Sequence, residues 1–198
     1  MAEVIVAVPQ ANPAPLGLFA FGMTTCVLSA VNAGLLPASG LPVLLPMALV
    51  YGGLAQVIAG IVEFRNGATF GATAFTSYGC FWIWFALTQW TVGTGLIKVD
   101  AAAATPMAGT ILLFWGIFTT LLWVVTLRAS KMLCLLFFLL AVTFFLLAAA
   151  HFGFQTSKLG GWLGLLTGVV AIILGFADLL NAVARRTILP TGVPFLVD

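Results

Sequence analysis

Charged side chains are scarce in this sequence. Its 198 residues include seven Lys and Arg, five Asp and Glu, and one His. Charges are absent from 4–62, 66–97, 101–127 and 159–177, among other stretches, and each of these can hold at least one bilayer-spanning helix of about 20 residues. With 63% hydrophobic and only 6% charged residues, the composition is far from that of a soluble domain. The alternating pattern of a β-barrel is missing, so the sequence predicts an all-α integral membrane protein.

The few cysteine, histidine and basic residues exclude several classes of function. Cys26, Cys80 and Cys134 have no CxxC spacing and no histidine cluster nearby, so we expect buried apolar thiols and neither a disulfide nor a metal site. No Ser–His pair, HExxH motif or carboxylate pair lies within an apolar run, which argues against an enzyme, and no cofactor is expected. The basic residues are few and scattered, so nucleic acid is not an expected partner. No basic segment follows Met1, and we expect no cleaved signal peptide.

Turn-forming and charged separators divide the chain into six predicted transmembrane helices. The helices are expected at about 13–36, 42–64, 70–91, 106–127, 132–152 and 159–184. Together they form one integral membrane domain over residues 1–198. The fifth helix carries almost nothing polar and is expected to face mostly lipid or a neighbouring subunit, with one face closing a pore by apolar contact.

Lysine and arginine are distributed unequally between the two ends of these helices. One end holds five and the other two, namely Arg65, Arg128, Lys131, Arg185 and Arg186 against Lys98 and Lys158. Because cytoplasmic loops carry the excess of basic residues, both termini are predicted to be cytoplasmic. The tails 1–11 and 186–198 then lie on the inner side of the plasma (inner) membrane.

Polar and small residues recur at helical spacing in the first three predicted helices. A polar atom in hydrocarbon needs a partner, so these faces are expected to meet in a shared interior or along a hydrated path. The three faces are Phe21, Thr25, Leu28 or Ser29, and Asn32; Gly52, Gln56, Gly60 and Glu63; and Thr69, Thr73, Thr76 or Ser77, and Cys80.

The first helix opens on two closely spaced prolines, which are tolerated only in a first turn. Asn12 is expected to be the N-cap, with Pro13 at the first helical position and Pro15 at the third. The amides of Ala14 and Leu16 and the Asn12 side chain would then form a donor cluster at the positive end of the helix dipole, which attracts small anions. The alternative is that these residues only start a helix cleanly.

Several motifs resemble one known family. They are NPAPLGL at 12–18, FGMTT at 21–25, YGGLAQ at 51–56 and GATFGATAFTSYG at 67–79. The sequence is similar to the acetate uptake transporter family, the succinate-acetate permeases of bacteria and their archaeal and fungal relatives. The resemblance covers most of the chain and weakens between residues 90 and 108.

This resemblance implies a transporter of acetate, and of succinate or other short carboxylates, that works as an anion channel or a proton-coupled symporter. It also implies a ring-shaped homo-oligomer, a hexamer, in which each protomer has its own pore. In the family, a narrow apolar constriction is attributed to a Phe, a Tyr and a Leu on the first, third and fifth helices. The matching positions are Phe21, Tyr78 and Leu140; packing in a core is the alternative for each.

A site for a small monocarboxylate needs hydroxyl or amide donors, an apolar lining, and no fixed cation that would trap the anion. No Lys or Arg lies inside any of the six predicted helices. The candidate substrate contacts are Asn12, Ala14, Leu16, Thr24, Thr25, Gln56 and Ser77. Any single hydroxyl can instead bond to its own backbone one turn back, so the hypothesis rests on the set.

Three titratable residues are candidates for carrying a proton. Glu63 and Asp178 lie at helix ends, where a nonpolar surrounding favours the protonated carboxyl. The alternative is a salt bridge, from Glu63 to Arg65 or the C-terminal basic pair and from Asp178 to Arg185. His151, the one histidine of the sequence, stands alone at the end of the fifth predicted helix.

Two other classes of function remain as alternatives. A channel for a neutral small solute, such as urea or an amide, needs much the same donors and aromatic slots. A structural or assembly protein would leave the buried polar faces on three helices unexplained.

Overall fold

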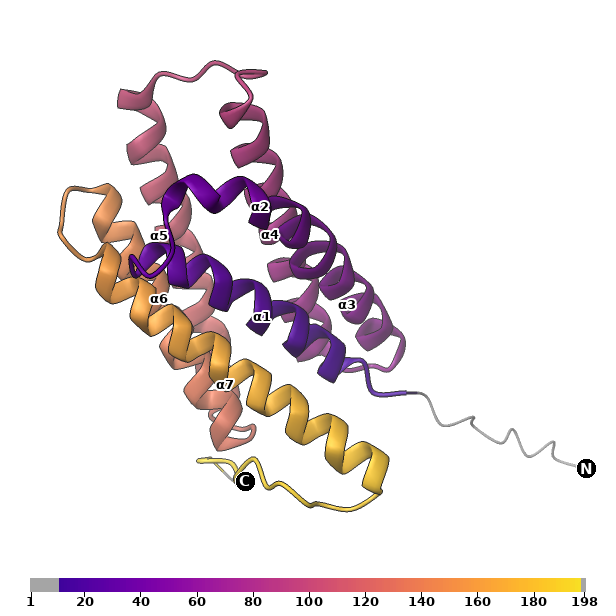
Figure 1. The fold of residues 1–198 in the computed structure, drawn as a ribbon. Helices are drawn as coiled ribbons and strands as arrows, with labels where there is room; N and C mark the ends of the chain where they lie inside the picture. Colours follow the sequence, from indigo (N-terminus) through magenta and orange to yellow (C-terminus); the bar gives the residue numbers. More distant parts are fainter. Residues whose placement is uncertain (1–10, 197–198) are drawn as a thin grey trace, which may run out of the picture.

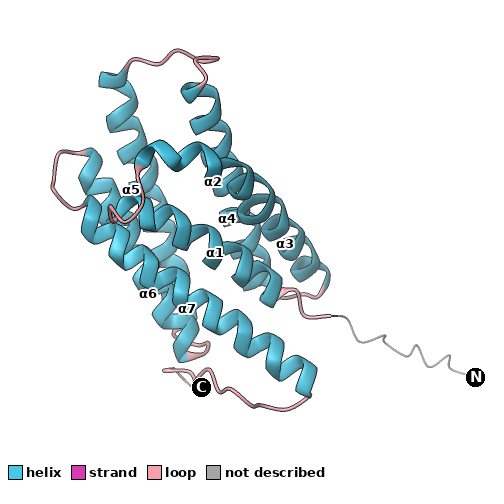
Figure 2. Ribbon diagram, viewed as in Figure 1, coloured by secondary structure: helices cyan, strands magenta, loops and turns pink. Residues whose placement is uncertain are grey.

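Every element of the part that the structure describes, residues 11–196 of a computed structural model, is helical (Figures 1 and 2). The elements are α1 (Ala14–Asn32), η1 (Ala38–Gly40), α2 (Leu41–Met47), η2 (Ala48–Ala55), α3 (Gln56–Arg65), α4 (Thr69–Gly93), α5 (Ala101–Thr126), α6 (Lys131–His151) and α7 (Ser157–Ala184). Because η1, α2, η2 and α3 follow one another directly, the nine elements make the six helical segments that the sequence predicts. Most of the predicted N-terminal tail, 1–11, lies outside the described residues.

Two helix starts differ from the predicted ones. The helix α1 starts at Ala14, so Pro13 is its N-cap and Pro15 its second residue. The helix α5 starts at Ala101, five residues before the predicted start, because the Asp100 side chain caps it by accepting a hydrogen bond from the amide of Ala102 at 3.0 Å. Pro106 lies inside this helix and does not begin it.

The second segment changes its helical geometry along its length. Pro46 has no N–H to donate, and the stretch Ala48–Ala55 that follows it is a π-helix. Its two glycines pack tightly, since a methyl group at Gly52 would lie 2.9 Å from Thr24 and one at Gly53 would lie 2.6 Å from Ile83. The π-helix ends where Gln56 begins α3.

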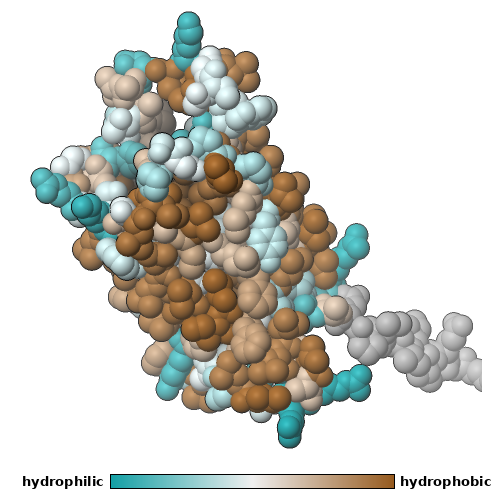
Figure 3. All heavy atoms as spheres, viewed as in Figure 1, coloured by the Kyte–Doolittle hydropathy of each residue, from teal (hydrophilic) through white to brown (hydrophobic). Residues whose placement is uncertain are grey.

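The helices have the length and polarity of membrane spans. Five described segments combine 18 or more residues with the required hydropathy: α1, 38–65, α5, α6 and α7. The remaining segment, α4, has 25 residues, and at 1.5 Å per residue it is also long enough to cross about 30 Å of hydrocarbon. Hydrophobic residues cover the middle of the molecule and polar ones gather toward its ends (Figure 3). The chain is a multi-pass membrane protein.

The two described ends of the chain lie at the same end of the bundle. The start of α1, the α3–α4 turn, the α5–α6 turn and the end of α7 share that end in Figure 1. Residues after α7 run back beneath the bundle, where the amide of Met132 donates to Thr191 O at 3.0 Å and the amide of Phe195 donates to Leu127 O at 3.0 Å. The five basic residues of the orientation prediction therefore belong to one end.

The glycines of α7 pack against α1 within the protomer. Methyl groups added at Gly161 and Gly164 would collide with the backbone at Ala33 and with the Ser29 side chain, respectively. One at Gly168 would lie 2.8 Å from the carbonyl oxygen of Gly22 and 2.5 Å from Cys26 Sγ. Small residues allow such close approach of helices in membranes.

The helix α6 is more buried than expected. The sequence predicts that it faces mostly lipid or a subunit, yet Leu136, Phe137, Leu140 and Phe144 all belong to the main hydrophobic core. The most exposed span is instead α5. The prediction is wrong because a helix without polar residues suits a protein core and a lipid surface equally well.

We expect Gly168→Ala to destabilise the protein by about 1–3 kcal/mol, because the new methyl group would push α7 away from the α1 backbone. Thermal unfolding of the purified protein in detergent measures this change. Gly93→Ala is the control, since a methyl group there meets nothing within 4 Å. Equal stability of the two variants would contradict the close packing of α1 on α7.

Candidate functional site

Two cavities lie in line within the bundle and share only three lining residues. The proximal cavity, of about 220 Å³, faces the end that carries the chain termini and is bordered by Ala14, Glu63, Ser130 and Asp178. The distal cavity, of about 350 Å³, faces the other end and is bordered by Asn32, Gln89, His151 and Ser157. The residues that line both are Phe21 of α1, Tyr78 of α4 and Leu140 of α6. We call these three the waist.

The waist is a packed apolar contact. All three side chains are buried, and the rings of Phe21 and Tyr78 are tilted against each other with centroids 5.8 Å apart. Tyr78 also packs against Trp115 at 5.6 Å and Phe118 at 5.9 Å, both from α5. The ring is therefore held from two sides.

The Tyr78 hydroxyl is held by α5. Its oxygen lies 2.9 Å from Thr119 Oγ1, and Thr119 Oγ1 donates to Trp115 O at 2.6 Å. Because the single hydroxyl proton of Thr119 is used in that bond, Tyr78 donates and Thr119 accepts. A buried tyrosine hydroxyl needs such a partner, and this one directs the hydroxyl toward α5.

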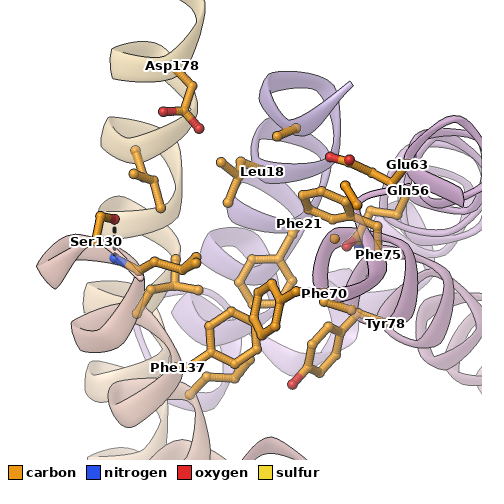
Figure 4. A pocket seen from close by; sticks show the side chains of 18 residues that line it. Leu18, Phe21, Gln56, Glu63, Phe70, Phe75, Tyr78, Ser130, Phe137 and Asp178 are labelled. Atoms are coloured by element: carbon orange, nitrogen blue, oxygen red, sulfur yellow. Dashed lines mark hydrogen bonds between the residues drawn. The ribbon is translucent and has the colours of Figure 1, made fainter. Parts of the chain in front are cut away.

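The proximal cavity carries an amide and two carboxyl groups on an otherwise largely apolar wall. Gln56 is fully buried, and its Nε2 donates to Gly52 O at 2.7 Å. Its Oε1 has no hydrogen-bond partner among the described residues. Figure 4 shows Gln56 and Glu63 on one side and Asp178 on the other, with Leu18 between them and the rings of Phe21, Phe70 and Phe137 below, toward Tyr78.

Neither carboxyl group of this cavity is paired with a described basic residue. Glu63 is buried and lies against Gly71, and Asp178 is half-buried on α7. Within residues 11–196 no salt bridge joins either of them to Arg65 or Arg185. The salt-bridge alternative is therefore wrong for these partners.

The distal cavity is bordered by hydroxyl, amide and indole groups. The predicted face of the first helix, Phe21, Thr25, Ser29 and Asn32, lines it, as expected of a face turned to the interior. Thr25 Oγ1 and Trp82 Nε1 are both buried and have no partner among the described residues. His151 lies at the rim, at the exposed end of α6.

Four candidate substrate contacts, Asn12, Leu16, Thr24 and Ser77, line neither cavity. Thr24 Oγ1 donates to Ala20 O at 2.8 Å, one turn back on its own helix. Asn12 Oδ1 accepts the amide of Ala14 at 3.0 Å, so this amide is not free for an anion. Leu16 is exposed. Of the predicted donor cluster, only Ala14 lines the proximal cavity.

Ser77 and its hydroxyl-bearing face turn to a different surface. Thr76, Ser77 and Cys80 line a groove that they share with Trp115 of α5, outside both cavities. The expectation that this face borders the shared interior is wrong. The face of α4 that lines the proximal cavity is instead Phe70, Ala74 and Tyr78, spaced four residues apart.

Three residues that position the waist were missed by the sequence analysis. Thr119, Trp115 and Phe137 all contact Tyr78. One signal in the sequence could have predicted such a contact: a buried tyrosine hydroxyl needs a hydrogen-bond partner, and a threonine on another helix can supply it. The sequence offers Thr119 and Thr120 side by side, and only the fold distinguishes them.

A sequence profile described as the GPR1/FUN34/yaaH family matches residues 3–193. The chain belongs to this family. It is 42% identical over 184 residues to the "Succinate-acetate/proton symporter SatP" of Escherichia coli (strain K12), covering 92% of this chain and 95% of that protein. It is also 38% identical over 204 residues to "Acetate permease A" of Emericella nidulans, covering 92% and 68%.

A solved structure is similar over nearly the whole fold. The "Structure of the bacterial acetate channel SatP" superposes with a TM-score of 0.86 at 40% identity, covering 93% of this chain and 100% of that one. The predicted resemblance to acetate transporters is confirmed. These relatives are named as transporters and a channel, in agreement with the prediction that the chain is not an enzyme.

We expect Tyr78→Phe and Thr119→Val to be coupled by about 0.5–1.5 kcal/mol in a double-mutant cycle of unfolding, because each removes one side of the same buried hydrogen bond. Pairing Tyr78→Phe with Thr120→Val is the control, since the Thr120 hydroxyl donates to Gly116 O and does not contact Tyr78. Additive effects in both cycles would show that α5 does not hold the Tyr78 hydroxyl.

Proposed function

We propose that this protein moves acetate, and succinate or related short carboxylates, across the plasma (inner) membrane through the proximal cavity, the waist and the distal cavity. The observation that carries the proposal is that two cavities, opening toward opposite ends of a membrane-spanning bundle, meet only at Phe21, Tyr78 and Leu140. The names of the relatives supply the substrate class.

The chemistry of the path supports a small carboxylate as cargo. Gln56 and Thr25 each present a buried polar atom without a protein partner, one on either side of the waist. We assign substrate contact to these two residues. The waist between them is apolar, which suits the methyl end of acetate.

The orientation and the assembly belong to the same proposal. The excess of basic residues at the end that holds the termini supports a cytoplasmic position for the tails 1–11 and 186–198. The family resemblance supports a ring-shaped homo-oligomer, a hexamer, with one pore in each protomer. The proximal cavity then opens to the cytoplasm.

Transport by proton symport and transport by an anion channel make different demands on the path. Symport in which the protein carries the proton needs a titratable group on the path, and the candidates are Glu63 and Asp178 in the proximal cavity and His151 at the distal rim. A channel needs no such group, and the three residues then have structural roles.

Uptake of labelled acetate into proteoliposomes at clamped voltage, with and without a pH gradient, tests the proposal. Accumulation against the acetate gradient that requires inward-moving protons indicates symport. Uptake that follows the electrochemical gradient of the anion and carries current indicates a channel. Protein-dependent uptake of labelled urea in the absence of acetate uptake would instead favour the neutral-solute alternative.

We expect Phe21→Ala and Tyr78→Ala to widen the waist and to lower the ratio of acetate flux to benzoate flux at least about tenfold. A narrow apolar passage excludes a larger molecule through steric contacts with a few side chains, and these variants remove such contacts. Competing flux in proteoliposomes measures the ratio. Leu135→Ala is the control, because Leu135 is an exposed residue of α6 that lines neither cavity. Unchanged flux and unchanged selectivity in both waist variants would mean that the waist is assigned wrongly.

A further inference from the structure

The hydrogen bond of Gln56 fixes which end of its amide faces the proximal cavity. The Gly52 carbonyl oxygen can only accept, so the atom 2.7 Å from it must be Nε2. The oxygen of the same amide therefore points elsewhere, and it is buried without a partner in a residue that lines the cavity. Figure 4 shows this side chain beside Phe21 and Phe75.

An amide oxygen can only accept a hydrogen bond. A buried acceptor without a donor costs free energy, so the cavity beside Gln56 is suited to a ligand that carries an O–H or N–H group. Gln56 also keeps one N–H that is not used by Gly52. Gln56 therefore offers a ligand one acceptor, Oε1, and one donor, the second N–H of Nε2.

The charges of the proximal cavity disfavour an anion. Within residues 11–196 its titratable lining residues are Glu63 of α3, Tyr78 of α4 and Asp178 of α7, and no described Lys, Arg or His lines it. The Tyr78 hydroxyl is engaged with Thr119, so it offers no proton to a ligand. A carboxylate anion in this cavity would find no positive partner and would meet two carboxyl groups.

We propose that Gln56 binds the neutral carboxylic acid, and that the proton crosses the waist on the substrate. The O–H of the acid donates to Gln56 Oε1, and the acid carbonyl accepts the remaining N–H of Gln56. The carboxylate anion has no O–H and would set a negative oxygen against Oε1. This inference rests on the proposed carboxylate transport and names the species that is moved.

The apolar waist favours the same species. Phe21 and Leu140 present no polar atom, and the hydroxyl of Tyr78 is bonded to α5. Moving an ion past such a contact removes its hydration shell and puts no polar group in its place. The free-energy cost of dehydration is smaller for the neutral acid than for the anion. The acid–base equilibrium of acetate with water supplies the proton, so no group on the protein has to carry it through the waist.

The wild-type protein gives the first test. In proteoliposomes at clamped voltage, acetate flux and current are recorded together, with protein-free vesicles to subtract diffusion of the acid through lipid. We expect protein-dependent acetate flux that carries no current. Acetamide, a neutral molecule of the same shape with a donor and an acceptor, is expected to inhibit this flux.

Variants of the cavity give the second test. Gln56→Met keeps the length of the side chain but removes both polar atoms, and we expect inhibition by acetamide to weaken at least about tenfold. Thr167→Val is the control, because Thr167 is equally buried, donates its hydroxyl to Leu163 O and lines neither cavity. In Glu63→Gln and Asp178→Asn, flux is expected to remain electroneutral.

Three results would overturn the inference and leave the transport proposal standing. The first is acetate flux that carries one charge per acetate. The second is flux that acetamide does not inhibit, since Gln56 Oε1 then binds water only. The third is electroneutral flux that becomes electrogenic in Glu63→Gln or Asp178→Asn, since the proton then travels on the protein. A complete lack of protein-dependent acetate flux would overturn the transport proposal itself.

Discussion

The close contact between α1 and α7 is the constraint on which the rest of the structure depends. Because Gly22 and Gly168 bring the two backbones together without side chains between them, the helices cannot slide past each other without a clash. The adjoining face of α1 is then fixed toward the bundle interior. Phe21 and Thr25 lie on that face, at the waist and in the distal cavity, so the α7 glycines position the path without lining its narrowest part.

Hydrogen-bond partners divide the buried polar residues into two groups. Thr24, Thr119, Thr143 and Thr167 each donate to a backbone carbonyl of their own helix, which is the ordinary way to keep a hydroxyl in hydrocarbon. Gln56 Oε1 and Thr25 Oγ1 have no such partner. Among the described residues Trp82 Nε1, Thr76 Oγ1 and Trp123 Nε1 are also without a partner, and of these three only Trp82 lines a cavity. In a membrane an unsatisfied polar atom is costly, so the unpaired atoms of Gln56, Thr25 and Trp82 are the ones that a ligand or water in a cavity can satisfy.

The sequence predicts the helices well because its separators are sharp. Proline, glycine and charged residues mark the loops, and the one large error, the start of α5, arose from overlooking the capping aspartate Asp100. The waist residues were identified through the family motifs and not through periodicity. Periodicity alone gave an incorrect face for α4, since Ser77 and Tyr78 are adjacent in sequence and lie about 100° apart on a helix.

Contacts between distant helices could not be read from the sequence. Whether a threonine bonds to its own helix or faces a cavity depends on which side the neighbouring helix takes, as Thr24 and Thr25 show. The glycine ridge of α7 presented the same difficulty, since packing within a protomer and packing between protomers require the same small residues. In the structure it packs against α1.

The two cavities differ in the polar atoms that they leave unpaired, and this difference locates the selection of charge. The distal cavity offers the Thr25 hydroxyl and the Trp82 indole N–H, groups that can donate to an oxygen of the acid or of the anion. The proximal cavity offers the Gln56 acceptor beside Glu63 and Asp178, an arrangement that only the acid satisfies. In the proposed transport of the neutral acid, selection for that species lies on the proximal side of Phe21, Tyr78 and Leu140, where the carboxylate anion has no O–H to donate to Gln56 Oε1.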